Sequence, residues 1–271
     1  MDLSMSINRT SMPNKSPLRY PGGKTRALAI LERYLEMHYP GRTQLLSPFL
    51  GGGSFELAQA NKGMQVFAND LFVPLYTFWQ VLKLDPKGLH AAVLKHVPVS
   101  KETFTTFRSS KLDYSDPQDT AAAYFIVNRC SFSGATFCGG FSSEAAEKRC
   151  NQSAVDRLLE VDLRNVTLSN QDAIDFLRSH PERRDTVIYA DPPYYISSYV
   201  YGKDGDMHEG FDHAGFAAYI RTRKDWILSY NDCPYIRELY AGCRIYSESW
   251  SYGMNNNGKA SSEVIILPPE A

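Results

Sequence analysis

An acid, two prolines and a tyrosine follow the apolar run 187–190 of the chain, as Asp191, Pro192, Pro193 and Tyr194. Two consecutive prolines fix the backbone, remove two N–H donors and leave carbonyl groups without a local donor. The Asp191 carboxylate and the Pro192 carbonyl can together accept both protons of one planar amino group, and Tyr194 offers a face on which a heterocycle can stack. A buried strand ended by a turn would explain the prolines, but not the acid and the tyrosine that flank them. These four residues are therefore candidates for a catalytic site.

A glycine-rich turn and a later acid form a second group. Gly51, Gly52 and Gly53 follow a short apolar run, and Asp70 ends another run 17 residues after Gly53. A strand, a glycine turn, a helix and a strand that ends in an acid can bind a nucleoside cofactor, because glycines admit close backbone approach and the acid can bond ribose hydroxyls. Glu56 stands where a dinucleotide motif has its last glycine, which disfavours a pyrophosphate site. A purely structural turn, with Asp70 as a helix N-cap, explains the same residues equally well.

Lys24 lies next to Gly22 and Gly23 in the segment 20–25, YPGGKT. The segment resembles a phosphate-binding loop, but Leu18 occupies the position of that motif's first glycine and no strand pattern precedes it. An NTPase site is therefore disfavoured. Lys24 can still meet a carboxylate or a phosphate, and a solvated lysine at the start of a helix is the alternative.

Strand patterns and helical patterns alternate along most of the chain. Strands are predicted at residues 44–50, 66–68, 166–168, 186–190, 226–229, 244–246 and 263–267. Helices are predicted at residues 25–38, 55–61, 172–177, 214–221 and 234–241, with Ser54 as an N-cap. Residues 72–128 have a mainly helical pattern, and residues 131–151 are predicted as a loop or hairpin. This alternation predicts a largely parallel α/β sheet with a helical insertion, and it places Asp191 at the carboxyl edge, where such sheets bind ligands.

Composition limits the class of protein. The 271 residues carry 29 Lys and Arg against 30 Asp and Glu, and 43% are apolar. These values exclude disorder of the whole chain and give no sign of nucleic-acid or membrane binding in the net charge. The five cysteines are irregularly spaced and contain no C-x-x-C pair, which favours reduced thiols over a disulfide framework or a metal site. Without an apolar run of about 18 residues or a signal-peptide core, the chain is expected to be soluble and cytoplasmic.

Three segments of the chain together resemble the signature motifs of the Dam-type DNA adenine-N6 methyltransferases. They are residues 191–194 (DPPY), 48–54 (PFLGGGS) and 19–24 (RYPGGK), and two further family segments resemble 127–134 and 256–259. The resemblance implies a Rossmann-like class I methyltransferase sheet, mostly parallel with an antiparallel edge strand, plus a helical target-recognition insertion. It divides the chain into a catalytic domain of residues 16–71 and 166–271, a recognition subdomain of residues 72–165, and a flexible N-terminus of residues 1–15.

The resemblance also implies S-adenosylmethionine as the cofactor. By position, Lys24 would pair with the methionine carboxylate of the cofactor, Asp70 with its ribose, and Asp172 would lie near its adenine. Tyr20 and Pro21 stand where the family often has Trp-Ala, which keeps an aromatic surface. The complete implied cofactor set is Tyr20, Gly22, Gly23, Lys24, Phe49, Gly51, Gly53, Asp70, Asp172 and Asp191.

The activity implied is methyl transfer to the exocyclic N6 of an adenine that has flipped out of duplex DNA and stacks on Tyr194. The expected DNA contacts are Asn128, Arg129, Lys148 and Arg149. The hairpin after Gly134 lacks the arginine that Dam proteins carry there, so recognition of GATC does not follow from the resemblance. Such enzymes occur in prokaryotes and their viruses, and a cognate restriction endonuclease acting separately would fit as a partner.

Two other functions are compatible with the same motifs. A cytosine-N4 or RNA methyltransferase of the same fold would use the same chemistry, although Asp191, where cytosine enzymes carry serine, argues against cytosine. A catalytically silent DNA-binding module is the alternative from another class. All proposed catalytic positions are filled, which disfavours a silent module.

Overall fold

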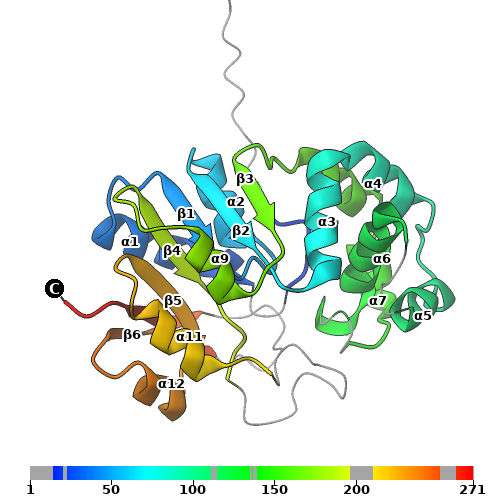
Figure 1. Ribbon diagram of the computed structural model, residues 1–271. Coiled ribbons are helices and arrows are strands. Elements are labelled where there is room, and N and C mark those ends of the chain that lie inside the picture. Colours follow the sequence, from blue (N-terminus) through cyan, green and yellow to red (C-terminus); the bar gives the residue numbers. More distant parts are fainter. Residues whose placement is uncertain are drawn as a thin grey trace, which may run out of the picture.

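A single sheet forms the centre of the fold (Figure 1). The computed structural model describes residues 15–20, 23–110, 115–134, 136, 139–195, 210–250 and 261–270. Within these residues the sheet has seven strands in the order β3-β2-β1-β4-β5-β7-β6. The strands are β1 (Gln44–Ser47), β2 (Gln65–Asn69), β3 (Val166–Ser169), β4 (Thr186–Ala190), β5 (Trp226–Asn231), β6 (Arg244–Trp250) and β7 (Ser261–Leu267).

The direction of the strands decides which residues meet at the carboxyl edge of the sheet. Strands β3, β2, β1, β4 and β5 are mutually parallel, whereas β7 is antiparallel to both β5 and β6. In this register Asn231, the last residue of β5, lies opposite Glu263 near the start of β7. The structure confirms the expected α/β sheet, which is mostly parallel. Its antiparallel strand is β7, which lies between β5 and the edge strand β6. An antiparallel strand thus contributes its first residues to the edge at which the parallel strands end.

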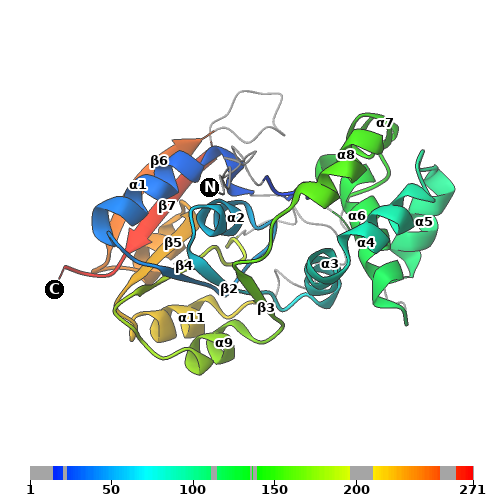
Figure 2. The same ribbon diagram turned by 90° about the horizontal axis from the view of Figure 1, so that it is seen from above.

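Burial on both faces explains why the central strands are apolar throughout. All five residues of β4 are buried, and so are the first five of β5. Helices α1 (Leu28–His38) and α2 (Ser54–Asn61) cover one face of the sheet. Helices α9 (Ala173–Ser179), α11 (His213–Ile220) and α12 (Pro234–Leu239) cover the other (Figure 2). Two apolar cores, one on each side of the sheet, therefore hold the strand ends in place.

A group of helices between β2 and β3 packs beside the sheet, on the right in Figure 1. They are α3 (Val73–Leu84), α4 (Pro86–Leu94), α5 (Lys101–Ser109), α6 (Pro117–Cys130), α7 (Ser143–Arg149) and α8 (Gln152–Asp156). Helix α6 is the central one, because its residues from Thr120 to Cys130 are all buried. Its core is continuous with the apolar cluster beneath α1 and α2. The helical insertion therefore shares a core with the sheet, and the proposed domain boundaries stay a prediction.

Among the described helices, none has the length and apolar character that a membrane span requires.

Two local predictions need correction. The segment 131–151, predicted as a loop or hairpin, has an antiparallel bridge between Ser131 and Phe141 in its first half. Its second half contains helix α7, whose N-cap residue Ser142 accepts a hydrogen bond from the backbone N–H of Ala145. The cap and the Glu144–Lys148 pair, four residues apart, stabilise this short helix locally. Ser54 is the first residue of α2, and the N-cap is Gly53 in the left-handed conformation, with a φ of 65°.

Asn128 joins the helical insertion to the N-terminal segment. Its side chain is fully buried, its Oδ1 accepts from the Arg19 N–H at 2.9 Å, and its Nδ2 donates to the Arg19 carbonyl at 2.7 Å. The same amide donates to the Gly134 carbonyl and the Thr136 hydroxyl, both at 3.3 Å. These bonds use the polar atoms of Asn128 inside the protein, so its predicted contact with DNA gains no support from this placement and stays a prediction.

We expect Asn128→Ala to lower the free energy of unfolding by about 2–4 kcal/mol, because it leaves several buried backbone groups without their partner. Urea unfolding followed by tryptophan fluorescence measures this change. The control is Lys148→Ala, which removes an exposed ion pair and should change stability by less than about 0.5 kcal/mol. An Asn128→Ala protein as stable as that control would contradict the structural role.

Candidate active site

Asp191 lies directly after β4, with both carboxylate oxygens held by neighbouring side chains. Its Oδ2 accepts a hydrogen bond from the Lys24 ammonium at 2.6 Å, and its Oδ1 accepts one from the Ser229 hydroxyl at 2.8 Å. Ser229 belongs to β5 and also lies 3.0 Å from the Tyr189 hydroxyl of β4. The carboxylate is 23% exposed, so it is oriented by the protein and still open to a ligand.

Lys24 is buried, which is unusual for a lysine. It begins the short helix η1 (Lys24–Arg26) after a turn in which the Gly23 N–H donates to the Tyr20 carbonyl at 2.9 Å. Its side chain is 4% exposed, and its ammonium also donates to the Tyr194 hydroxyl at 2.8 Å. The nitrogen lies 5.1 Å from the centre of the Tyr194 ring. One ammonium therefore connects the acid and the tyrosine of the segment 191–194.

Two further acids are buried beside this pair. Glu56 of α2 is 3% exposed and accepts from the Ser47 hydroxyl at 2.7 Å, while Glu263 of β7 is 1% exposed and lies 3.8 Å from the Lys24 ammonium. Burial raises the pKa of each to about 7, with hydrogen bonding from Ser47 opposing the rise for Glu56 and the charge of Lys24 opposing it for Glu263. Both acids can therefore change charge near neutral pH.

Glu263 and Ser229 are two residues of the site that were not predicted from the sequence. Ser229 is a polar residue inside an apolar strand, and Glu263 is a charged residue at the start of one. Each is a weak local signal, because a charged residue before a strand is usually solvated. Only the pairing of β7 with β5 brings Glu263 to the edge where Asp191 lies.

The glycine turn and Asp70 hold each other at the ends of β1 and β2. The Gly51 N–H donates to Asp70 Oδ2 at 2.9 Å, and the Phe72 N–H donates to Asp70 Oδ1 at 3.0 Å. Asp70 is 9% exposed, and burial raises its pKa to about 6 against these two hydrogen bonds. From α3, the Trp79 indole donates to the Gly51 carbonyl at 3.1 Å. The helical insertion therefore helps to position the turn.

Close packing against Tyr20 explains why this turn is built of glycines. A Cβ at Gly52 would lie 2.7 Å from the Tyr20 Cβ, and one at Gly51 would lie 3.0 Å from the Tyr20 ring. Gly51 also has a φ of 49°, which disfavours a side chain. The structure thus brings together Tyr20, Gly51 and Gly53 of the expected cofactor set. Gly22 and the segment 256–259 lie outside the described residues.

Phe49 and Asp172 also lie at the carboxyl edge of the sheet. Phe49 follows β1, is partly exposed and packs edge-on against Phe211 and Phe216, with ring centres 5.4 and 5.2 Å away. Asp172 follows β3 and is exposed, and its Oδ1 caps α9 by accepting from the Ile174 N–H at 2.8 Å. The strands β1 to β4 are thus followed in turn by Phe49, Asp70, Asp172 and Asp191.

The expected DNA-contacting residues divide into buried and exposed ones. Arg129 is 8% exposed, and its guanidinium donates to the backbone carbonyls of Arg149 and Pro17. Two of its donor groups thus hold the protein backbone, so the predicted phosphate contact of Arg129 gains no support from this placement and stays a prediction. Lys148 and Arg149 are exposed at the end of α7, although Lys148 is paired with Glu144 at 3.1 Å.

Positive charge gathers around Arg129. Burial, together with the charges of Arg157, Arg19 and Arg149, lowers its pKa to about 10. Arg157 is exposed and was not identified from the sequence. Phe132, on the turn Phe132–Gly134 after α6, has 70% of its surface exposed. The described part of the helical insertion therefore carries a local concentration of positive charge, and it also exposes an aromatic ring.

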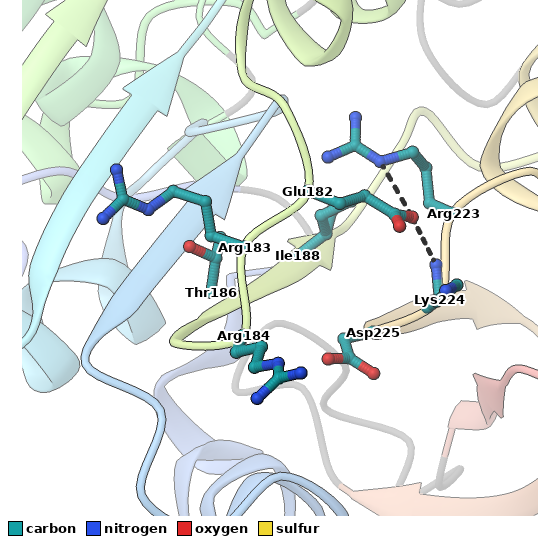
Figure 3. Close-up of a pocket in the computed structure, with 8 residues that line it drawn as sticks. All are labelled: Glu182, Arg183, Arg184, Thr186, Ile188, Arg223, Lys224 and Asp225. Atoms are coloured by element: carbon teal, nitrogen blue, oxygen red, sulfur yellow. Dashed lines mark hydrogen bonds and ion pairs between the residues drawn. The ribbon is translucent and has the colours of Figure 1, made fainter.

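A separate pocket lies at the opposite end of the sheet, where β4 and β5 begin (Figure 3). Charged side chains line it, and Glu182 contacts both Arg223, at 3.6 Å, and the Lys224 N–H, at 3.0 Å. It contains none of the predicted site residues. The catalytic candidates therefore gather at the carboxyl edge alone, within the described part of the chain.

Comparison with known proteins identifies one family. No curated protein matches the chain significantly. A family model, described as D12 class N6 adenine-specific DNA methyltransferase, matches residues 20–254, which include the Lys24 turn, the glycine turn and Asp191. Because the match covers most of the 271 residues, the chain belongs to the family of D12 class N6 adenine-specific DNA methyltransferases and is an adenine-N6 DNA methyltransferase.

Proposed function

We propose that the enzyme transfers a methyl group from S-adenosylmethionine to the N6 of an adenine rotated out of duplex DNA. The observation that carries this proposal is the Asp191 carboxylate, held on one oxygen by Lys24 and on the other by Ser229, beside Tyr194. The arrangement offers an oriented acceptor for an amino group next to a ring on which the base can stack.

The residues around the glycine turn fit S-adenosylmethionine, which supplies an electrophilic methyl group on a positively charged sulfur. Each carboxylate oxygen of Asp70 already accepts a hydrogen bond from one backbone N–H. Each oxygen can accept a second hydrogen bond, so the carboxylate can also bind a ribose hydroxyl. Phe49 offers a partly exposed ring for an adenine, and Asp172 lies after the neighbouring strand. The buried acids Glu56 and Glu263 and the partly exposed Asp191 favour a cation at the edge between them.

Asp191 would activate the amino nitrogen of the target adenine. The nitrogen's lone pair is delocalised into the ring, so accepting its protons at Asp191 and at the Pro192 carbonyl favours a pyramidal nitrogen with a localised pair. The nitrogen forms the new N–C bond as the donor's C–S bond breaks, and the electron pair of that bond remains on sulfur. One amino proton passes to Asp191 and then to water. Positioning and charge placement supply the rate enhancement.

Lys24 acts on Asp191 in this scheme, in addition to any contact with the cofactor carboxylate. Its buried ammonium stabilises negative charge on the acid 2.6 Å away and fixes the Tyr194 hydroxyl. The base would leave the duplex to reach these groups, which costs a few kcal/mol of unstacking. Phe132, which is exposed on the turn after α6, is suited to insert at the position that the base leaves in the stack.

We expect Asp191→Asn to reduce methyl transfer by about 100- to 1,000-fold, because the amide places a donor where the amino protons need an acceptor. Transfer of a tritium-labelled methyl group into unmethylated duplex DNA measures the rate. Asp175→Asn, an exposed change on α9, is the matched control and should keep the rate of the unmodified enzyme. Unchanged turnover in Asp191→Asn would contradict the mechanism.

The methylated base identifies the reaction. Enzymatic digestion of the product DNA followed by mass spectrometry should find N6-methyladenine, and methylation-sensitive sequencing should place it at a defined site. N4-methylcytosine, or transfer to RNA in preference to DNA, would support the alternative activities of the same fold.

DNA binding should depend on few phosphate contacts, because the chain has a net charge of -1 and its cations are local. We expect the double variant Arg149→Ala/Arg157→Ala to weaken binding to all sequences and to reduce the slope of log binding constant against log salt by about 2. Fluorescence anisotropy at several salt concentrations measures this slope. Arg178→Ala on α9 is the control. A slope equivalent to about ten phosphates for the unmodified enzyme would show that the DNA face is wrongly assigned.

A further inference from the structure

Glu263 is a buried acid that none of the signature motifs contains. It lies near the start of β7 and is 1% exposed. In the register of the sheet it is opposite Asn231 of β5 and Glu248 of β6, and Glu248 is itself paired with Arg33 at 2.9 Å. The antiparallel direction of β7 brings Glu263 to the carboxyl edge, beside the segment that follows β4.

Lys24 connects Glu263 to the catalytic acid. The Lys24 nitrogen lies 3.8 Å from Glu263 Oε2 and 2.6 Å from Asp191 Oδ2, and it donates to the Tyr194 hydroxyl at 2.8 Å. Both Lys24 and Glu263 are nearly inaccessible to water, so their charges are weakly screened. One ammonium is therefore shared between two carboxyl groups, of which only Asp191 is open to a ligand.

The charge of Glu263 must change how strongly Lys24 holds Asp191. When Glu263 is ionised, it attracts the Lys24 ammonium, which then neutralises less of the negative charge of Asp191. Asp191 is then a stronger acceptor of hydrogen bonds from a substrate. When Glu263 is protonated, Lys24 pairs with Asp191 alone and weakens it as an acceptor. An ionised Glu263 also favours the positive charge that develops on the amino nitrogen during methyl transfer.

We propose that Glu263 is a positioning residue for methyl transfer, which acts by holding the Lys24 ammonium between itself and Asp191. This role rests on the proposed function, because it concerns the acceptor strength of Asp191. The groups that face this site from the packed elements are Lys24 of η1, Glu56 of α2, Tyr189 of β4, Asp191 and Tyr194 after it, and Glu248 of β6.

The sign of the pH dependence follows from burial. Burial raises the pKa of Glu263 to about 7, so the acid is ionised above that pH and neutral below it. Single-turnover methyl transfer by the unmodified enzyme should therefore rise as the pH increases through about 7. Glu56 has its pKa raised to about 7 as well, so the same profile must be measured for a Glu56 variant.

The test is single-turnover transfer of a labelled methyl group to duplex DNA between pH 6 and 9, with Glu263→Gln, Glu263→Asp and Glu56→Gln compared with the unmodified enzyme. We expect Glu263→Gln to be about 10- to 100-fold slower at pH 8 and to lose the rise near pH 7. Glu263→Asp should recover part of the rate and keep the rise, and Glu56→Gln should keep the rise. The affinity for S-adenosylmethionine, from calorimetry, and the melting temperature should be nearly unchanged in Glu263→Gln.

Three results would overturn the role of Glu263. They are an unchanged rate and profile in Glu263→Gln, a parallel loss of cofactor affinity and melting temperature in that variant, or loss of the rise in Glu56→Gln alone. No transfer by the unmodified enzyme to any adenine-containing duplex would overturn the proposed function itself, and this role with it. The first three results leave the proposed function intact, so the two failures are distinguishable.

Discussion

The buried ion pair between Lys24 and Asp191 is the interaction on which the site depends. An ammonium that is 4% exposed loses most of its hydration, and this cost is recovered only by close, well-directed partners. Asp191 supplies the first partner at 2.6 Å and Tyr194 the second at 2.8 Å. Because the loss of Asp191 would leave the buried ammonium with only the Tyr194 hydroxyl and the more distant Glu263 as partners, the turn before η1 and the segment after β4 are constrained to meet. The rest of the fold has to satisfy that constraint.

The sheet satisfies it by bringing together residues that are far apart in sequence. Parallel strands place Asp70 and Asp191 at one edge, and the single antiparallel strand β7 adds Glu263 there through its first residues. The helical insertion takes part as well, since Trp79 of α3 holds the Gly51 carbonyl and Asn128 of α6 holds Arg19. The helical insertion is thus bonded to the two turns of the candidate active site. A displacement of the insertion would be transmitted to both turns.

Patterns of adjacent residues were sufficient to predict the strands and the position of Asp191. The central strands are apolar because they are buried on both faces, and each of them was predicted within a few residues. Burial of polar side chains was not predictable in the same way. Asn128 and Arg129 have the chemical character of DNA contacts, but their environment is set by tertiary packing of α6. Glu263 was missed for the same reason, because its neighbours in space are distant in the chain.

The near-neutral net charge can be reconciled with a DNA substrate through this packing. Arg129 is buried among Arg19, Arg149 and Arg157, so positive charge is concentrated locally, and its pKa is lowered first by burial and then by these neighbouring charges. Buried acids concentrate negative charge at the neighbouring carboxyl edge, where the Lys24 ammonium offsets only part of it. In the proposed function, the first region would attract the phosphate backbone and the second a cationic methyl donor. Such a separation of the two signs of charge is compatible with an average over the chain that is close to zero.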